Sequence, residues 1–277
     1  MLKTRIITAL VLMAVLLPVL FFNSFPAFAL IVTAFLGAAL WESLRLFRQR
    51  QAELVAILCS AGFVLLFLLN NGLAQAKIWF LLCAAMWLIR FVPALATGLP
   101  PLEGSPNKLL SLAYGLAIVG CFVAIVVLFR HSPLYLLSVL ALVWSADIGA
   151  YFSGKAWGRR KLAPSISPGK SWEGAVGGAV AVLLLSALAI LCAPGAAWLQ
   201  DTFAVQLQAR LGWLAALALL LLIVAASVVG DLFESMLKRR AGIKDSSALL
   251  PGHGGVLDRI DALIPVLPLA ALIGAWL

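Results

Sequence analysis

Long apolar runs separated by short polar segments dominate this chain of 277 residues. A helix that crosses the hydrocarbon core of a bilayer needs about 20 mainly apolar residues, so the spans can be counted directly. We expect nine, at residues 6–22, 25–41, 54–69, 78–96, 109–129, 134–152, 174–191, 211–229 and 260–276. Only Asn23 and Ser24 separate the first two, which leaves a kinked hairpin as an alternative for that pair. The pattern predicts an all-α polytopic membrane protein with about nine transmembrane helices.

The composition agrees with this class. Hydrophobic residues make up 64% of the chain and charged residues 11%, and the mean hydropathy of +1.10 is far above that of a water-soluble domain. The four cysteines stand singly in or beside apolar runs without the spacing of a zinc site, so we expect them to pack or to face lipid. The N-terminus imitates a secretory signal peptide, but the apolar sequence continues past the candidate cleavage site at 27–29, so we expect no cleavage there.

Most of the 20 Lys and Arg residues fall in alternate polar segments, which predicts the orientation of the chain. Because cytoplasmic loops retain positive charge, the N-terminus is expected in the cytoplasm and the C-terminus on the outer side. We therefore predict a multi-pass protein integral to the cell inner (cytoplasmic) membrane. The net charge of +9 then belongs to a basic cytoplasmic face, which suits anionic lipid headgroups and nucleotides and gives no indication of nucleic-acid binding.

Ionisable groups divide the chain into two unequal regions. Residues 1–130, with about five spans and few charges, are expected to form an N-terminal scaffold. Residues 131–277, with about four spans, are expected to form the catalytic region, because they carry two polar cytoplasmic loops at 153–173 and 230–259.

One carboxylate, Asp147, lies within the sixth run, about five residues from its inner end and so roughly 8 Å below it. A carboxylate at that depth is costly unless it faces protein, water or a cation. Pairing with Arg90 in the fourth run is the structural alternative. We favour a polar site, because the loop that follows supplies compatible ligands.

That loop combines glycines with five basic residues, which are Lys155, Arg159, Arg160, Lys161 and Lys170. Lys170 and Ser171 directly precede the seventh run, whose N-terminus offers free N–H groups and the positive end of a helix dipole. We therefore expect both residues to bind phosphate. For residues 159–161, anchoring at the membrane surface is an equally good interpretation.

The segment 230–261 is the densest in functional groups. Four of them share one face if the eighth helix continues past the membrane, at the i, i+3, i+4 and i+7 positions Asp231, Glu234, Ser235 and Lys238. Asp258 and Asp261 show the same i, i+3 relation where the ninth helix begins. Two converging helix ends with a carboxylate from each predict a divalent-metal site. The alternative for Glu234 and Asp261 is a simple ion pair with a neighbouring base, Lys238 or Arg259.

Residues 251–255, Pro-Gly-His-Gly-Gly, have no rationale in packing. The glycines permit a positive φ and close approach of the backbone to a ligand. His253 is thereby presented to a phosphoryl oxygen. The other histidine, His131, lies beside Pro133 in an outer turn, and we interpret it as incidental.

Together these residues resemble the signature of the phosphatidate cytidylyltransferase family, also called CDP-diacylglycerol synthase. The matching positions are Ser235, Lys238, Arg239, Lys244, Asp245, Pro251, Gly252, His253, Gly254, Gly255, Asp258, Arg259 and Asp261, preceded by Gly230 and Asp231. Residues 147–151 and 167–174 resemble the accessory elements of the family, with Ser171 where Thr is more usual. The long signature is very specific, whereas the first half of the chain matches mainly in hydropathy.

The resemblance implies that CTP condenses with phosphatidic acid in the membrane to give CDP-diacylglycerol and pyrophosphate, with Mg2+ required. The residue types suit this reaction: the phosphatidate oxygen is already anionic, so the harder task is to bring two polyanions together and stabilise the leaving pyrophosphate. A second cation and a homodimer are left open.

We assign roles on this basis. The metal ligands are Asp231, Asp258 and Asp261. The catalytic set is Asp231, Asp258, Lys238, His253 and Asp261. The substrate-binding set is Lys170, Ser171, Ser235, Arg239, Lys244, Gly254, Gly255, Arg259 and Asp147.

Two other functions compete with this one. A CDP-alcohol phosphotransferase would need an Asp-Gly-Ala-Arg group followed by two further aspartates, which the chain lacks. An ion or anionic-lipid transporter could use Asp147, Arg90 and the loop charges, but no repeat with matching broken helices is visible.

Overall fold

A computed structural model describes residues 24–69 and 76–275 continuously, with a few isolated positions before residue 24. The helices are α2 (Phe25–Leu46), α3 (Ala52–Leu69), α4 (Ala76–Met86), η1 (Trp87–Phe91), α5 (Val92–Thr97), α6 (Ser105–His131), α7 (Pro133–Trp157), α8 (Trp172–Cys192), η2 (Ala193–Gly195), η3 (Ala197–Asp201), α9 (Phe203–Ala241), α10 (Leu257–Ile260) and α11 (Leu263–Gly274). The two strands are β1 (Lys161–Ala163) and β2 (Ser167–Ser171). The first predicted span, 6–22, lies largely outside the described residues.

Six helical segments in the described part are long and apolar enough to cross a membrane. They are α2, the continuous α4–η1–α5 segment, α6, α7, α8 with η2, and α9. Two further apolar helices, within α3 and α11, are shorter. Each falls where a hydrophobic run predicts a span, and the prediction of an all-α polytopic membrane protein is confirmed.

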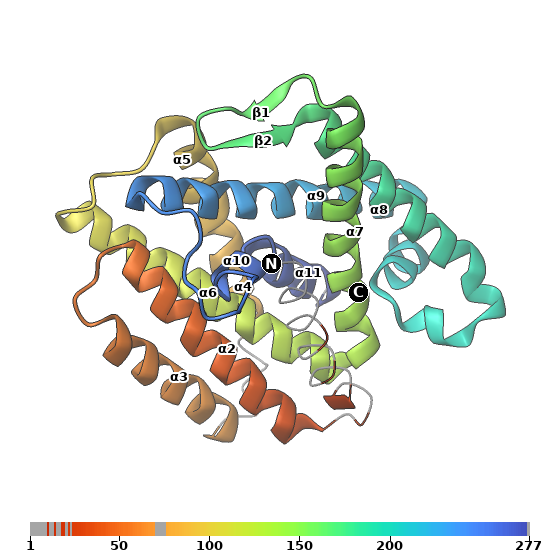
Figure 1. Ribbon diagram of the computed structural model, residues 1–277. Helices are drawn as coiled ribbons and strands as arrows, with labels where there is room; N and C mark the ends of the chain where they lie inside the picture. The colour runs from red at the N-terminus through yellow and green to blue at the C-terminus, as the bar shows by residue number, and fades with distance from the viewer. Residues whose placement is uncertain are drawn as a thin grey trace.

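The centre of the molecule is α11, which packs against α6, α9 and α4 (Figure 1). α2 lies along α6, and α3 covers the outer side of α2. A buried aromatic cluster joins three of the spans: the Phe233 ring of α9 lies 4.8 Å from that of Phe91 in η1 and 5.2 Å from that of Tyr114 in α6. Because α11 packs against three other helices, the C-terminal helix is part of the core.

The helices α7 and α8 approach each other closely because glycines face each other along their contact. A Cβ on Gly149 would lie 2.6 Å from the Cβ of Ala181, and a Cβ on Gly178 would lie 2.6 Å from the carbonyl oxygen of Ala146. Small residues at such positions let two helix backbones pack in a membrane, where close van der Waals contact drives association. This seam forms one wall of the cavity described below.

Several helices extend beyond their apolar runs into polar sequence. α7 continues to Trp157, so the polar loop predicted at 153–173 begins later than expected. Its remainder folds into an antiparallel hairpin that pairs Lys161 with Ser171, which hydropathy alone does not indicate. α9 continues to Ala241, where Gly242 ends it with a φ of 74°. The condition for Asp231 and Lys238 to share a helix is thereby met.

Candidate active site

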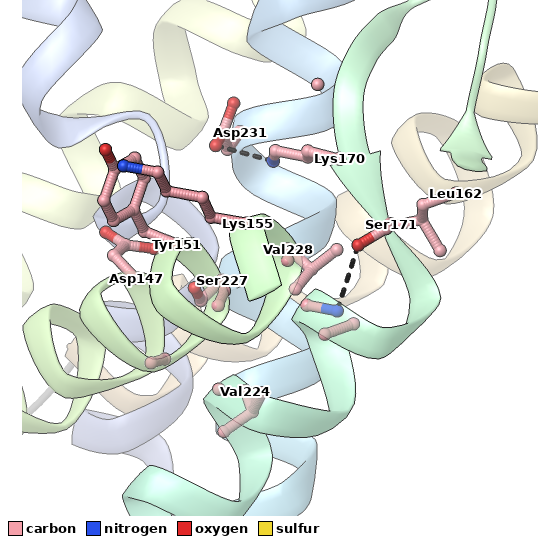
Figure 2. A pocket seen from close by; sticks show the side chains of 17 residues that line it. Asp147, Tyr151, Lys155, Leu162, Lys170, Ser171, Val224, Ser227, Val228 and Asp231 are labelled. Carbon is pink, nitrogen blue, oxygen red and sulfur yellow. Dashed lines mark hydrogen bonds and ion pairs between the residues drawn. The ribbon is translucent and has the colours of Figure 1, made fainter. Parts of the chain in front are cut away.

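A cavity of about 430 Å³ lies between α7, α8, α9 and the hairpin (Figure 2). Its polar lining includes Asp147 and Lys155 from α7, Lys170 and Ser171 from β2, and Asp231 from α9. Tyr151 and Ser227 add hydroxyl groups, and the rest of the wall is apolar or small: Ala146, Ala150, Gly154, Leu162, Gly169, Gly174, Ala175, Gly178, Val224 and Val228. A largely apolar chamber that also carries charged groups suits an amphipathic molecule with an anionic headgroup and an apolar tail.

Lys170 and Asp231 form an ion pair across this cavity, with 2.6 Å between the ammonium nitrogen and a carboxylate oxygen. Figure 2 shows the two side chains pointing toward each other from β2 and α9. The other Asp231 oxygen accepts a hydrogen bond from Ser235 at 3.3 Å. A predicted phosphate ligand and a predicted metal ligand thus neutralise each other in this structure.

Ser171 lies at the junction of β2 and α8. Its side-chain oxygen accepts a hydrogen bond of 3.1 Å from the backbone N–H of Gly174, which makes Ser171 the N-cap of α8. Glu173, in the first turn of α8, accepts from the backbone N–H groups of Arg159 and Arg160 at 3.2 Å. These contacts fix the hairpin against α8, so Lys170 is held at the helix N-terminus.

Asp147 faces the same cavity from the middle of the α7 packing seam. In the described part of the chain it makes no ion pair with Arg90, so the structural alternative raised by the sequence is not what the structure shows. Asp147 and Asp231 instead contribute two carboxylates to one chamber.

A second group of predicted residues gathers around Lys238. Its ammonium lies 2.6 Å from a carboxylate oxygen of Asp258 and also pairs with Glu234, one turn back on α9. Glu234 is fully buried and the Asp258 side chain is 4% exposed. The alternative that Glu234 pairs with its helical neighbour is therefore what the structure shows. One cation serves two buried carboxylates.

The second Asp258 oxygen is occupied by the loop around it. It accepts from the backbone N–H groups of Ser246 at 2.9 Å and Gly255 at 2.8 Å, and the Ser246 hydroxyl lies 3.0 Å away. Burial by itself would raise the pKa of the Asp258 carboxyl, but the hydrogen bonds from Lys238 and from Gly255 hold that pKa below its usual value. Asp258 is thus surrounded by hydrogen-bond donors.

Asp261 is brought beside Asp231 by a missing side chain at Gly230. A Cβ on Gly230 would clash with the carbonyl oxygen of Asp261 and lie 2.9 Å from Pro265. Asp231 and Asp261 lie close enough for their charges to interact. Glycine at position 230 therefore lets α9 touch the chain that enters α11.

Each of the three predicted metal ligands has a different partner in the structure. Among the described residues no three His, Cys, Asp or Glu side chains are arranged to hold a metal ion. Asp231 is held by Lys170 and Asp258 by Lys238, while Asp261 accepts from its neighbouring N–H at Ala262. Asp147 and Asp231, which both line the chamber, still supply hard oxygen donors of the type Mg2+ prefers, so the chamber fits the ion chemically.

The Pro-Gly-His-Gly-Gly segment lines a second hollow of about 760 Å³. Its basic lining residues are Lys244, His253 and Arg259, and the Nε of Arg259 donates to the His253 carbonyl oxygen at 3.0 Å. Gly252 and Gly254 have φ values of 76° and 80°, as the glycine-rich sequence predicts. The buried Nδ1 of His253 has no hydrogen-bond partner among the described groups.

Two predicted substrate ligands have other contacts in the structure. Arg239 lines neither hollow, and its Nε donates to the Ile166 carbonyl oxygen of the hairpin at 3.4 Å. Gly255 is packed so tightly that a Cβ would lie 2.5 Å from Glu42 of α2. Glu42 was missed by sequence reasoning, although a lone carboxylate directly after the apolar run that ends at Trp41 is a usable signal.

Comparison of the sequence with known proteins identifies the family of this chain. Residues 3–277 match the Cytidylyltransferase family. The chain belongs to this family. A phosphatidate cytidylyltransferase from Pseudomonas aeruginosa is 44% identical to this family member, over 99% of its chain and 98% of the relative. Phosphatidate cytidylyltransferases from Haemophilus influenzae and Bacillus subtilis are 37% and 32% identical, each over at least 95% of both chains. The sequence similarity to these relatives extends over nearly the whole chain and therefore includes its N-terminal half.

Proposed function

We propose that the chain is a phosphatidate cytidylyltransferase, which condenses CTP with phosphatidic acid to give CDP-diacylglycerol and pyrophosphate. The observation that carries this proposal is the near full-length identity of 44% to a protein of that name. The chamber between α7, α8 and α9 supports it, because it joins an apolar wall to the Lys170–Asp231 pair.

The reaction requires no strong base in the protein. A phosphate oxygen of phosphatidate, anionic near neutral pH, attacks the α-phosphorus of CTP. The new P–O bond forms as the bond from the α-phosphorus to the bridging oxygen breaks, and that oxygen leaves with the β- and γ-phosphates as pyrophosphate. The task of the protein is therefore to hold two polyanions in line and to neutralise the departing charge.

We assign the cations to the two hollows. Lys170 and Lys155 line the chamber with the apolar wall, where the phosphatidate headgroup binds. Lys244, His253 and Arg259 line the second hollow, where the triphosphate binds. Lys238 lies between Glu234 and Asp258 and holds the loop of the second hollow against α9.

Mg2+ completes the proposed site. Asp231, Asp258 and Asp261 would hold the ion, with Asp147 facing the same chamber as Asp231. Bound there, it would neutralise phosphoryl oxygens of the nucleotide and of the leaving pyrophosphate. Asp258 can join such a site only by giving up donors that surround it now, Lys238 among them.

The finer topology is also part of the proposal. We infer nine spans, made of the 6–22 run, the six long segments, α3 and α11, with the N-terminus in the cytoplasm and the C-terminus outside. The basic ends of α7 and α9 then face the cytoplasm, which is the source of CTP. Acyl chains stay in the inner leaflet of the cytoplasmic membrane while the headgroup enters the chamber.

One assay tests the function directly. Purified protein in phosphatidate-containing nanodiscs receives CTP labelled at its α-phosphorus, and lipid-extractable label is compared with released pyrophosphate. We expect equal amounts of both, with dependence on phosphatidate. A CDP-alcohol phosphotransferase would instead consume CDP-diacylglycerol and release CMP, and a transporter would leave CTP intact. Folded wild-type protein that places no label in lipid would refute the proposal.

A further inference from the structure

Glu42 is a buried carboxylate at the inner end of α2, more than 200 residues from the groups it contacts. It is 0% exposed. Four donors reach its two oxygens: the hydroxyls of Ser246 (3.1 Å) and Ser247, and the backbone N–H groups of Val256 (3.0 Å) and Leu257 (2.6 Å). No Lys or Arg among the described residues forms an ion pair with it.

This arrangement satisfies a group that would otherwise be costly to bury. An ionised carboxylate removed from water must be hydrogen-bonded or paired. Its two oxygens offer about four lone-pair sites, and four donors fill them. Hydrogen bonds to a charged acceptor are stronger than neutral ones, so the contacts hold their donors firmly in place.

The donors come in two pairs that stand at opposite ends of one loop. Ser246 and Ser247 begin the segment, and Val256 and Leu257 end it. Between the pairs lie most of the residues that line the second hollow, including His253. One carboxylate from α2 thus fastens both ends of the loop to a membrane helix and leaves its middle available.

A single residue, Ser246, connects the Glu42 carboxylate to Asp258. The Ser246 hydroxyl lies 3.1 Å from an oxygen of Glu42 and 3.0 Å from one of Asp258, and the Ser246 N–H donates to Asp258 at 2.9 Å. Asp258 in turn binds Lys238 of α9. A continuous chain of contacts therefore runs from α2 through the loop to α9.

We propose that Glu42 is a positioning residue for nucleotide transfer: it closes the base of the 246–257 loop and thereby sets where His253 and Asp258 stand relative to α9. Glu42 lines neither hollow, so it acts through the loop and touches no substrate. The proposal rests on the proposed function for its kinetic consequence. It also assigns α2 a part in the reaction, although its region reads as scaffold in the sequence.

An activity-independent test uses hydrogen exchange of the protein in nanodiscs without substrate. In Glu42→Gln one acceptor oxygen becomes an NH2 donor that faces other donors, so the loop ends should loosen. We expect the amides of Val256 and Leu257 to exchange about tenfold faster or more, with α6 and α9 unchanged. Glu53→Gln, which removes an exposed carboxylate on neighbouring α3, is the matched control and should change nothing. Unaltered exchange at Val256 and Leu257 would overturn the proposal.

The kinetic test separates positioning from general stability. For Glu42→Gln we expect kcat/KM for CTP, per folded molecule, to fall about tenfold or more, whether or not the Tm also falls. A lower Tm with kcat/KM unchanged per folded molecule would mean a merely structural role and overturn the proposal. Glu42→Asp should recover part of the loss, because it keeps the charge on a shorter side chain.

A second variant covers the case in which Glu42→Gln does not fold. Ser247→Ala removes a single donor to Glu42 and should show a smaller loss in the same direction, in both exchange and kcat/KM. Where both variants fold, the double variant should lose less than the sum of the two single losses, because they remove one interaction. Wild-type exchange and kinetics in Ser247→Ala, or strict additivity, would contradict the proposal. Failure of the proposed function would be seen separately, as absence of lipid labelling by the wild type.

Discussion

Lys170 of β2 lies 2.6 Å from Asp231 of α9, and this ion pair closes one side of the chamber. Neither residue is deeply buried, since their side chains are 25% and 34% exposed. A phosphate that binds Lys170 and a cation that binds Asp231 therefore both compete with a contact that already exists. A phosphate that binds Lys170 would release Asp231 from the ion pair and leave its carboxylate free to bind the cation.

The first prediction concerns this competition. Lys170→Met should lower the Mg2+ concentration needed for half-maximal rate, because Asp231 loses its competing cation, and should lower kcat about tenfold or more. Initial rates over a Mg2+ titration measure both. Lys155→Met is the control, since Lys155 lines the same chamber without pairing to Asp231, and it should slow the reaction without a shift in Mg2+ dependence. An unshifted Mg2+ curve for Lys170→Met would contradict the competition.

A second prediction concerns Asp231 itself. Asp231→Asn should reduce the rate by at least about a hundredfold, because a neutral amide is a poor ligand for Mg2+ and no longer pairs with Lys170. Chelation of divalent ions should stop the wild-type enzyme, and added Mg2+ should restore it but not rescue the variant. The Tm should change little, since Asp231 is partly exposed. Full turnover in Asp231→Asn would exclude it as a metal ligand.

The third prediction is about stability. Lys238→Met leaves Glu234 and Asp258 buried without their shared cation, so we expect a loss of about 3–5 kcal/mol in the free energy of unfolding. Thermal unfolding in detergent measures it. Adding Glu234→Gln should recover part of the loss, because one uncompensated charge is removed. Arg239→Met, on the exposed neighbouring position, should stay within about 0.5 kcal/mol of wild type.

The fourth prediction tests the seam between α7 and α8. Gly178→Val should push the helices apart, because even its Cβ would lie 2.6 Å from the Ala146 carbonyl oxygen. We expect a loss of about 2 kcal/mol or more together with loss of activity, since Gly178 also lines the chamber. Gly62→Ala in α3 meets no atom within 4 Å and should be tolerated. Equal Tm values for the two variants would argue against close packing at the seam.

Hydropathy predicts the helices well because spans are selected for contact with lipid. The run 109–129 corresponds to α6 at Ser105–His131, and the run 134–152 to α7 at Pro133–Trp157. It predicts their polar ends less well, because backbone hydrogen bonds continue a helix after its contact with lipid ends. α9 therefore extends twelve residues past the run that ends at 229.

The sequence indicates the residue types of the site and the local pair of Glu234 with Lys238, but not the pairings between residues far apart in the chain. The sequence identifies Asp231, Lys170 and Asp258 as functional groups, since charged residues are rare in this chain. It cannot say that Lys170 binds Asp231, because that contact depends on how the hairpin folds over α9. Glu42 was lost for a similar reason: its four donors lie more than 200 residues away.

The length of α9 has a mechanical consequence. After a break at Gly212, the rest of α9 is one uninterrupted helix that carries Val224, in the apolar wall, together with Asp231 and Lys238, which hold the charged partners. A bilayer that is thinner or thicker than the helix prefers is accommodated by tilting it. Such a tilt moves all three groups together, whereas the 246–257 loop is also fastened to α2 through Glu42 and the hairpin to α8 through Glu173. The thickness of the surrounding bilayer can therefore change the distance between the two hollows.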